Sequence, residues 1–202
     1  MAAAEPRPLR ADARRNRDRL LEVAVQAFSQ DGPEVTLDAI AKQAGVGIGT
    51  LYRHFATREE LVEAAYRSEL VHLCDAAGEL LATRAPDEAL RAWMDGFIQY
   101  MTAKRGMADA LRALIASGGD PFSHSRTMLT AAITELLQAG AAAGVVRSDA
   151  EPDDVLFSLS GLSLAAATPE HQARMGRLLD LLMDGLRHRA AAAEPGSGAP
   201  SR

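Results

Sequence analysis

The sequence predicts an all-α protein. Apolar residues recur at the i, i+3, i+4 spacing of helices along nearly the whole chain, and no segment alternates apolar and polar residues as a half-buried strand does. Aromatic residues make up only 4% of the 202 residues, whereas alanine is abundant. A hydrophobic content of 48% is ample for a core, so we expect one large domain or two modest ones.

The composition also indicates where the protein works. No run of about 18 apolar residues is free of charge, and the N-terminal stretch MAAAEPRPLRADARRNRDR has no apolar segment. We therefore expect no membrane span, no secretion signal and a cytoplasmic location. The lone Cys74 cannot form an intramolecular disulfide, which fits a reducing compartment.

Charge is distributed unevenly along the chain. The net charge of −5 disfavours a polyanionic partner for the chain as a whole. The N-terminal end is nevertheless basic, because Glu5, Asp12 and Asp18 are outnumbered by Arg7, Arg10, Arg14, Arg15, Arg17 and Arg19. This end can steer the protein toward nucleic acid or can be a solvated arm, and we expect residues 1–13 to be disordered.

The first helix is expected over residues 13–30, and Gly32-Pro33 ends it. Its helical repeat is set by Leu21, Ala24, Val25 and Phe28. Thr36 can then cap a short helix over residues 37–44, and Gly45 suits the left-handed conformation that closes a helix. A turn and a second short helix, which runs to about Phe55, follow.

A long helix is expected over residues 58–82. Thr57 and Glu60 form a capping box, in which Thr57 accepts from the N–H of Glu60 and the Glu60 side chain returns to the N–H of Thr57. Proline and glycine divide the remainder into helices at about 87–104, 107–117, 121–143, 152–167 and 170–190. The tail, residues 191–202, is small, polar and proline-broken, so we expect it to be disordered.

The stretch AGVGIGTLYRHF, residues 44–55, has two interpretations. A glycine-rich loop can cradle a nucleotide phosphate, but the dinucleotide fingerprint needs a strand before the glycines, and here a capped helix precedes them. The glycine spacing fails as well, because the third glycine would fall at Thr50 or Tyr52. Helix, short turn and helix instead predict a helix-turn-helix, whose second helix lies in the major groove of DNA.

The second helix of this motif separates an apolar side from a polar one. At 100° per residue, Leu51 and Phe55 point together toward the preceding helices, while Gly49 and Arg53 point away. This outward stripe is flanked by Thr50, Tyr52 and His54. Their side chains, like that of Arg53, can donate to phosphates or to base edges.

The stretch VTLDAIAKQAGVGIGTLYRHFATREELVEAAY resembles the N-terminal DNA-binding domain of the TetR (tetracycline-repressor) family of bacterial transcription regulators. The resemblance covers about residues 14–73 and rests on Thr36, Ile40, Ala41, Ala44, Gly45, Val46, Gly49, Tyr52, His54, Phe55 and Arg58. It implies that phosphates are held by Thr36, Tyr52, His54 and Arg58. It also implies that Gly49 lets the helix approach the groove and that bases are faced by Ile48, Thr50 and Arg53.

Two positions need comment against that family pattern. Many members have Ser or Thr where this chain has Gly47, so the hydroxyl cap of the recognition helix and a possible phosphate contact are missing. Ile48 lies at the edge of the buried arc near Phe55. The sequence therefore leaves open whether Ile48 touches a thymine methyl group or packs inside the domain.

Residues 84–190 carry no G-x-S-x-G nucleophile elbow, no H-E-x-x-H motif and no paired Cys and His at zinc-ligand spacing, so we expect no enzymatic activity, no cofactor and no metal. Large, soft side chains of the kind that line apolar pockets are Trp93, Phe97, Tyr100, Met101, Phe122, Met128 and Phe157. The same residues at helical spacing can be ordinary core, which we favour for most of them.

The last two expected helices, 152–167 and 170–190, carry apolar arcs too wide for one neighbour. Meeting their symmetry mates, they would form a four-helix bundle in which Gly161 and Gly185 permit close backbone approach. This arrangement also resembles the usual dimer interface of the TetR family.

The sequence thus predicts a homodimeric transcriptional repressor that a small-molecule effector releases from double-stranded operator DNA. Residues 14–73 form the DNA-binding domain, with the helix-turn-helix at 36–55, and residues 74–190 bind the effector and the second protomer. The alternative is a small-molecule-binding or enzymatic helical protein in which the motif is vestigial. Salt-dependent DNA binding separates the two.

Overall fold

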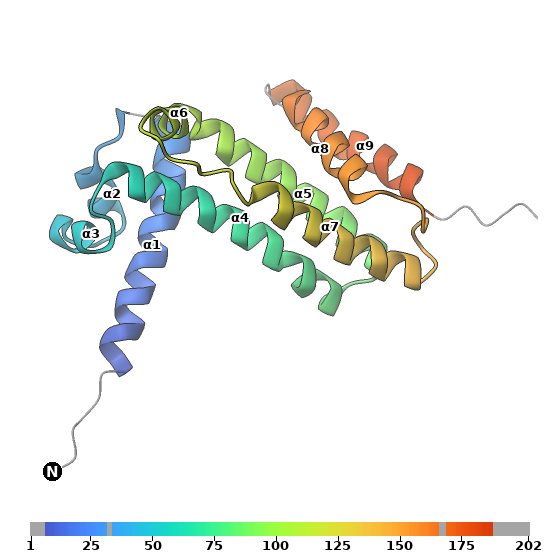
Figure 1. Ribbon diagram of the computed structural model, residues 1–202, viewed down its shortest axis with the longest axis horizontal. Coiled ribbons are helices and arrows are strands. Elements are labelled where there is room, and N and C mark those ends of the chain that lie inside the picture. Colours follow the sequence, from blue (N-terminus) through green and yellow to red (C-terminus); the bar gives the residue numbers. More distant parts are fainter. Residues whose placement is uncertain (1–6, 32–33, 166–168, 188–202) are drawn as a thin grey trace, which may run out of the picture.

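The computed structural model describes residues 7–31, 34–165 and 169–187, and within these ranges the chain is helical, as predicted (Figure 1). The helices are α1 (Arg7–Asp31), α2 (Leu37–Gln43), α3 (Ile48–His54), α4 (Arg58–Thr83), α5 (Pro86–Gly106), α6 (Ala108–Ala116), α7 (Ser125–Ala142), α8 (Pro152–Ala165) and α9 (Pro169–Leu186). None of them is long and apolar enough to cross a membrane.

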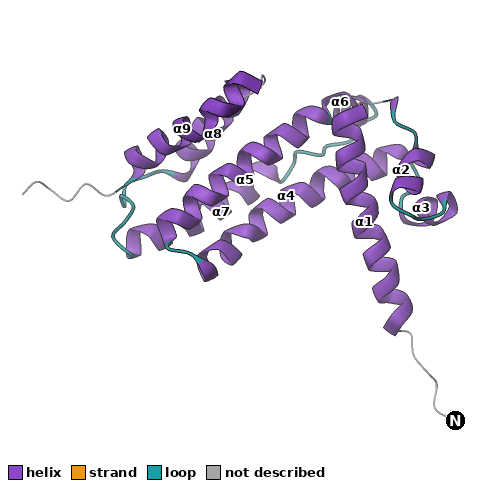
Figure 2. Cartoon of the chain, turned by 180° about the vertical axis from the view of Figure 1, so that it is seen from behind, coloured by secondary structure: helices purple, strands orange, loops and turns teal. Residues whose placement is uncertain are grey.

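Helix α1 begins at Arg7, so the prediction that residues 1–13 are disordered is wrong for residues 7–13. Pro8 is compatible with this start because the first turn of a helix does not need its missing N–H. The N-terminal half of α1 extends beyond the other helices (Figures 1 and 2). Residues 1–6 and the tail 191–202 lie outside the described residues, as do the expected helical residues 166–167 and 188–190.

The structure confirms the predicted caps Thr36 and Thr57, but the hydrogen bond of the Glu60 side chain has a different partner. The Thr36 hydroxyl accepts from the N–H of Ala39, and the Thr57 hydroxyl accepts from the N–H of Glu60, each at 3.1 Å. The Glu60 carboxylate, however, accepts from the N–H of Ala56 at 2.7 Å rather than from that of Thr57. The Glu60 carboxylate therefore bonds to the backbone N–H one residue before the one that the capping-box pattern predicts.

Helix α7 starts at Ser125, not at the expected residue 121. The Asp120 carboxylate accepts from the N–H of Phe122 at 3.2 Å, and residues 121–124 form turns. Asp120 therefore caps a turn instead of a helix, which is the other common use of an aspartate before proline. This turn brings Phe122 back against α4.

The central helix of the fold is α4, which packs against α1, α5, α6 and α7. Helices α1 to α3 lie at one end of it, whereas α8 and α9 form an outer layer beside α5 and α7 (Figure 1). Buried apolar residues run continuously through these helices as one core. Within it, the Trp93 indole donates to the Leu73 carbonyl at 2.8 Å and joins α5 to α4.

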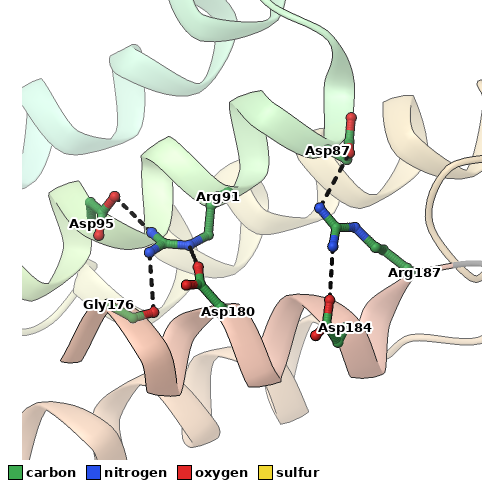
Figure 3. A network of polar contacts seen from close by, with 7 residues as sticks. All are labelled: Asp87, Arg91, Asp95, Gly176, Asp180, Asp184 and Arg187. Atoms are coloured by element: carbon green, nitrogen blue, oxygen red, sulfur yellow. Dashed lines mark hydrogen bonds and ion pairs between the residues drawn. The ribbon is translucent and has the colours of Figure 1, made fainter. Parts of the chain in front are cut away.

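Polar contacts hold the outer helix α9 on α5 (Figure 3). The Arg91 guanidinium reaches from α5 to the Asp180 carboxylate at 2.8 Å and to the Gly176 carbonyl at 3.3 Å. At the end of α9, the Arg147 N–H donates to the Leu186 carbonyl at 2.8 Å. These contacts position one side of α9 and leave the other side facing outward.

Candidate DNA-binding site

Helices α2 and α3 form the predicted helix-turn-helix. Gly45 follows α2 with a φ of 70°, in the left-handed region, and the Val46 N–H donates to the Ala41 carbonyl at 3.0 Å. Only glycine adopts this conformation without strain, so Gly45 sets the angle at which α3 leaves α2. Gly47 then begins α3 in an extended conformation, without a side-chain cap.

Helix α3 is attached by one face. Leu51 is 0% exposed and Phe55, directly after the helix, is 2% exposed, as the helical geometry predicts. On the other side Arg53 is exposed, and a side chain added at Gly47 or Gly49 would meet nothing within 4 Å. The major groove of a DNA duplex could therefore approach the backbone of α3 closely on this side.

The two side chains flanking this open face differ from ordinary core residues. Ile48 is 37% exposed and Tyr52 is 51% exposed, although both are large. Thr50 and His54 are half-buried at its edges. Ile48 is therefore not enclosed in the core and is accessible on this face of α3.

Arg58 lies differently from its predicted phosphate-binding role. Its guanidinium donates to the Val35 carbonyl at 2.5 Å and stands 4.9 Å from the centre of the Phe28 ring. These contacts tie the start of α4 to α1 and to the segment before α2. Arg58 therefore helps to position α4.

Sequence reasoning missed a second positioning arginine. The guanidinium of Arg17 on α1 lies 5.3 Å from the centre of the Phe55 ring at the end of α3. Such a cation–π contact contributes about 0.5–1 kcal/mol at an exposed site. The sequence showed a cluster of arginines in this segment but not which of them meets an aromatic ring.

Comparison with known families agrees with this geometry. Residues 20–65 match the family described as bacterial regulatory proteins, tetR family, and residues 85–188 match the C-terminal domain of SbtR-like transcriptional regulators. The chain belongs to the TetR family of bacterial transcriptional regulators.

Solved structures of TetR-family regulators resemble this chain along most of its length. One from Streptomyces coelicolor is 53% identical, with a TM-score of 0.83, and the match covers 86% of this chain and 99% of that one. Another, from Mycobacterium vanbaalenii, is 37% identical, with a TM-score of 0.74 and coverage of 89% and 99%. Helix-turn-helix-type regulators of Staphylococcus aureus are 44% identical over 54 residues, which is 26% of this chain and 29% of theirs.

In this TetR-family chain, most of the predicted pocket residues are core. Trp93, Phe97 and Tyr100 are each at most 4% exposed. Met128 is half-buried against the core, whereas Phe157 is 83% exposed on α8 and lies apart from the others. The predicted ligand-binding set is thus divided between the interior and an outer surface.

Two members of that set, Met101 and Phe122, do line a cavity, of about 240 Å³, beside α5 and α6. Leu111 and Ile115 complete its apolar wall, and its cationic residues are Lys104, Arg105 and Arg112. Burial lowers the pKa of Lys104. The sequence signal for these residues is the Lys104-Arg105 pair, which the spacing of large apolar side chains does not pick out.

Behind this cavity is a buried group of hydroxyls. The Tyr66 hydroxyl lies 2.6 Å from the Tyr100 hydroxyl and 2.9 Å from that of Ser125, so α4, α5 and α7 meet there. Burial, together with the hydrogen bond to Tyr66, raises the pKa of Tyr100, which keeps the group uncharged. The Phe122 ring stands edge-on to Tyr66, with 5.2 Å between ring centres.

Helices α8 and α9 expose apolar side chains that no described residue covers. Leu164 is 73% exposed and Leu181 is 67% exposed, in addition to Phe157, and Gly161 and Gly185 have open space beside them. We call these five residues the α8–α9 surface. Leu182, by contrast, is half-buried and packs against the core.

Proposed function

We propose that this regulator binds double-stranded operator DNA with α3 in the major groove. The observation that carries the proposal is the open outer face of α3, where Gly49 and Arg53 meet solvent while Leu51 anchors the helix. An arginine on such a face can form two hydrogen bonds to a guanine, and Ile48 can contact a thymine methyl group. Thr50 stands beside them at the edge of the same face.

Phosphate contacts in this proposal come from the sides of α3 and from α1. Thr36 and Tyr52 are exposed and keep hydroxyl donors, and His54 is half-buried at the end of the helix. Arg14 and Arg15 are exposed residues of α1. The N-terminal half of this helix projects past the domain (Figure 1). The charges of the two arginines supply an electrostatic attraction that the hydroxyl donors lack.

The protein acts as a homodimer in this proposal, and the α8–α9 surface is the interface. An exposed apolar patch with two open glycines suits a symmetric packing in which helices approach closely. Two copies joined there present two recognition helices to two half-sites, which lie about one helical turn apart for such dimers.

An effector in the C-terminal domain then lowers the affinity for the operator, so that the protein is a ligand-released repressor. By linkage, an effector that weakens DNA binding a hundredfold must itself be bound about a hundredfold more weakly by the DNA-bound protein, a coupling of about 2.7 kcal/mol. Repression follows when the operator overlaps a promoter.

Binding to DNA at increasing salt tests the proposal. If Arg14 and Arg15 of each protomer neutralise one phosphate each, a plot of log K against log salt should have a slope of roughly −3 to −4 per dimer. The operator is identified first by selecting bound sequences from random DNA with the full-length protein. A slope near zero, or no selected sequence, would favour the rival function, a helical small-molecule-binding protein with a vestigial motif.

A further inference from the structure

We propose that the effector is a compact anionic amphiphile, a carboxylate with an apolar body, and that its charge pairs with Lys104 in the α5–α6 cavity. This inference rests on the proposed function, because it names the class of molecule that acts at the effector site. The cavity combines an apolar wall with cationic residues and has no acidic residue in its lining.

Among the three cations, Lys104 is the one whose side chain has neither a hydrogen bond nor an ion pair with a described residue. Arg105 donates to the Ser163 carbonyl at 2.7 Å and to the Thr102 hydroxyl at 3.0 Å, and Arg112 pairs with Asp109. The Lys104 ammonium lies 4.1 Å from the centre of the Phe122 ring and 5.6 Å from that of Tyr66. Aromatic faces attract a cation but leave its charge unneutralised.

The environment of Lys104 adds a second argument. Burial lowers the pKa of Lys104, and among the described residues no carboxylate interaction offsets this effect. A carboxylate beside the ammonium would favour its charged form and receive a charge-assisted hydrogen bond. Binding of a carboxylate would therefore offset the desolvation of the Lys104 ammonium in the free protein.

The wall and volume of the cavity determine the polarity and size of the ligand body that fits. Met101, Leu111 and Phe122 are apolar, and Ile115 is 46% exposed at its edge. A volume of about 240 Å³ is below the range of roughly 300–1,000 Å³ that is usual for ligand pockets. A short chain or a single ring fits this volume better than a steroid-sized molecule.

The cavity is also placed to influence the DNA-binding domain. A ligand that draws Lys104 away from Phe122 and Tyr66 acts on α4, because Tyr66 lies on that helix. Only three residues, 55–57, separate α4 from α3. At the end of α5, a Cβ added to Gly106 would come within 2.6 Å of the Ser29 Cα on α1. The cavity, which Lys104 and Arg105 help to line, therefore lies close to both connections to the DNA-binding domain.

A series of probes that share an eight-carbon chain tests the charge preference with the full-length protein. We expect calorimetry to give octanoate an affinity about tenfold or more above that of octanol, the usual worth of one charge-assisted hydrogen bond, and octyltrimethylammonium to bind more weakly than octanol. Equal affinities, or the reverse order, would overturn the inference.

Variants then assign the preference to the site. Lys104→Met should abolish the difference between octanoate and octanol, and Lys104→Arg should retain most of it. The control is Arg84→Gln, an exposed cation in the segment between α4 and α5, which should leave the difference unchanged. A preference that survives Lys104→Met would place the anion elsewhere and refute the assignment.

The same proteins separate this inference from the proposed function. DNA binding measured without any probe tests the helix-turn-helix alone. Salt-dependent DNA binding with no preference for octanoate would overturn only the ligand class. A Lys104-dependent preference for octanoate in a protein that binds no DNA would support the ligand class and overturn the proposed function.

Discussion

The outer face of α3 and the α8–α9 surface are both exposed, but for opposite reasons. On α3 the outward residues are glycine, arginine and tyrosine, whose polar groups remain hydrated until a partner replaces the water. On α8 and α9 the outward residues are phenylalanine and leucine, and Phe157 is 83% exposed. Polar exposure costs a free protomer little, whereas apolar exposure on this scale favours association.

In the proposed function, the two surfaces are used differently. Contacts made by α3 depend on charge and hydrogen bonds, so they should weaken with salt and can be made and broken repeatedly. Contacts made by the α8–α9 surface depend on burial of apolar area and should be far less sensitive to salt. A dimeric regulator that leaves DNA without dissociating into protomers needs both kinds of contact.

The largest expected effect comes from charging the apolar surface. Phe157→Glu and Leu181→Glu should each produce monomers, because a buried carboxylate without a partner disfavours the interface strongly. Loss of the second recognition helix should lower operator affinity roughly a hundredfold or more. Sedimentation velocity and DNA binding check both effects. Val71→Glu, at a 41% exposed apolar position on α4, is the control that should remain dimeric.

The polar face of α3 should respond with a smaller, sequence-dependent loss. Arg53→Ala should cost about 1–3 kcal/mol of operator binding and relax the base preference at one position in each half-site. Tyr52→Phe should instead weaken all sequences alike, since it removes a phosphate contact. Selection of bound sequences with both variants distinguishes these outcomes, and a preference altered by Tyr52→Phe alone would reverse the two assignments.

The junction between the DNA-binding domain and the C-terminal domain can be tested at Gly106, where α5 meets α1. Gly106→Ala should destabilise the protein by about 1–3 kcal/mol, because the new methyl group would meet the backbone of Ser29 on α1 and force α1 away from α5. Gly78→Ala is the matched control. Its new atom would meet nothing nearer than 3.7 Å, so it should stabilise α4 by about 0.5–1 kcal/mol. Urea unfolding measures both, and equal stabilities would exclude a tight junction there.

The smallest expected effect is at the start of the recognition helix. Gly47→Ser should raise stability by only a few tenths of a kcal/mol, because Gly47 already has the extended conformation of a cap and has room for a hydroxyl. Thermal unfolding should show a slightly higher melting temperature. A lower one would mean that the position needs glycine for a reason other than its conformation.

The sequence by itself determined the helices, their caps and the motif. Thr36, Gly45 and Thr57 act through backbone groups within a few residues of themselves, and the apolar spacing around Leu51 follows from the pitch of one helix. Such short-range effects do not depend on the rest of the fold. For this reason the buried and outward faces of α3 could be predicted, whereas the starts of α1 and α7 were predicted wrongly.

Only the tertiary structure decided which of several similar side chains serves which purpose. Arg58 and Arg53 are both arginines near α3, yet Arg58 turns inward to Val35 and Phe28 because α1 packs beside it. Phe97 and Phe157 are equally apolar, yet one is buried and the other exposed, because α5 is surrounded by helices and α8 lies in the outer layer. Lys104 meets Phe122 only because the turn after α6 folds back toward α4. These contacts join residues distant in the chain, so they depend on how whole helices pack and not on any local pattern.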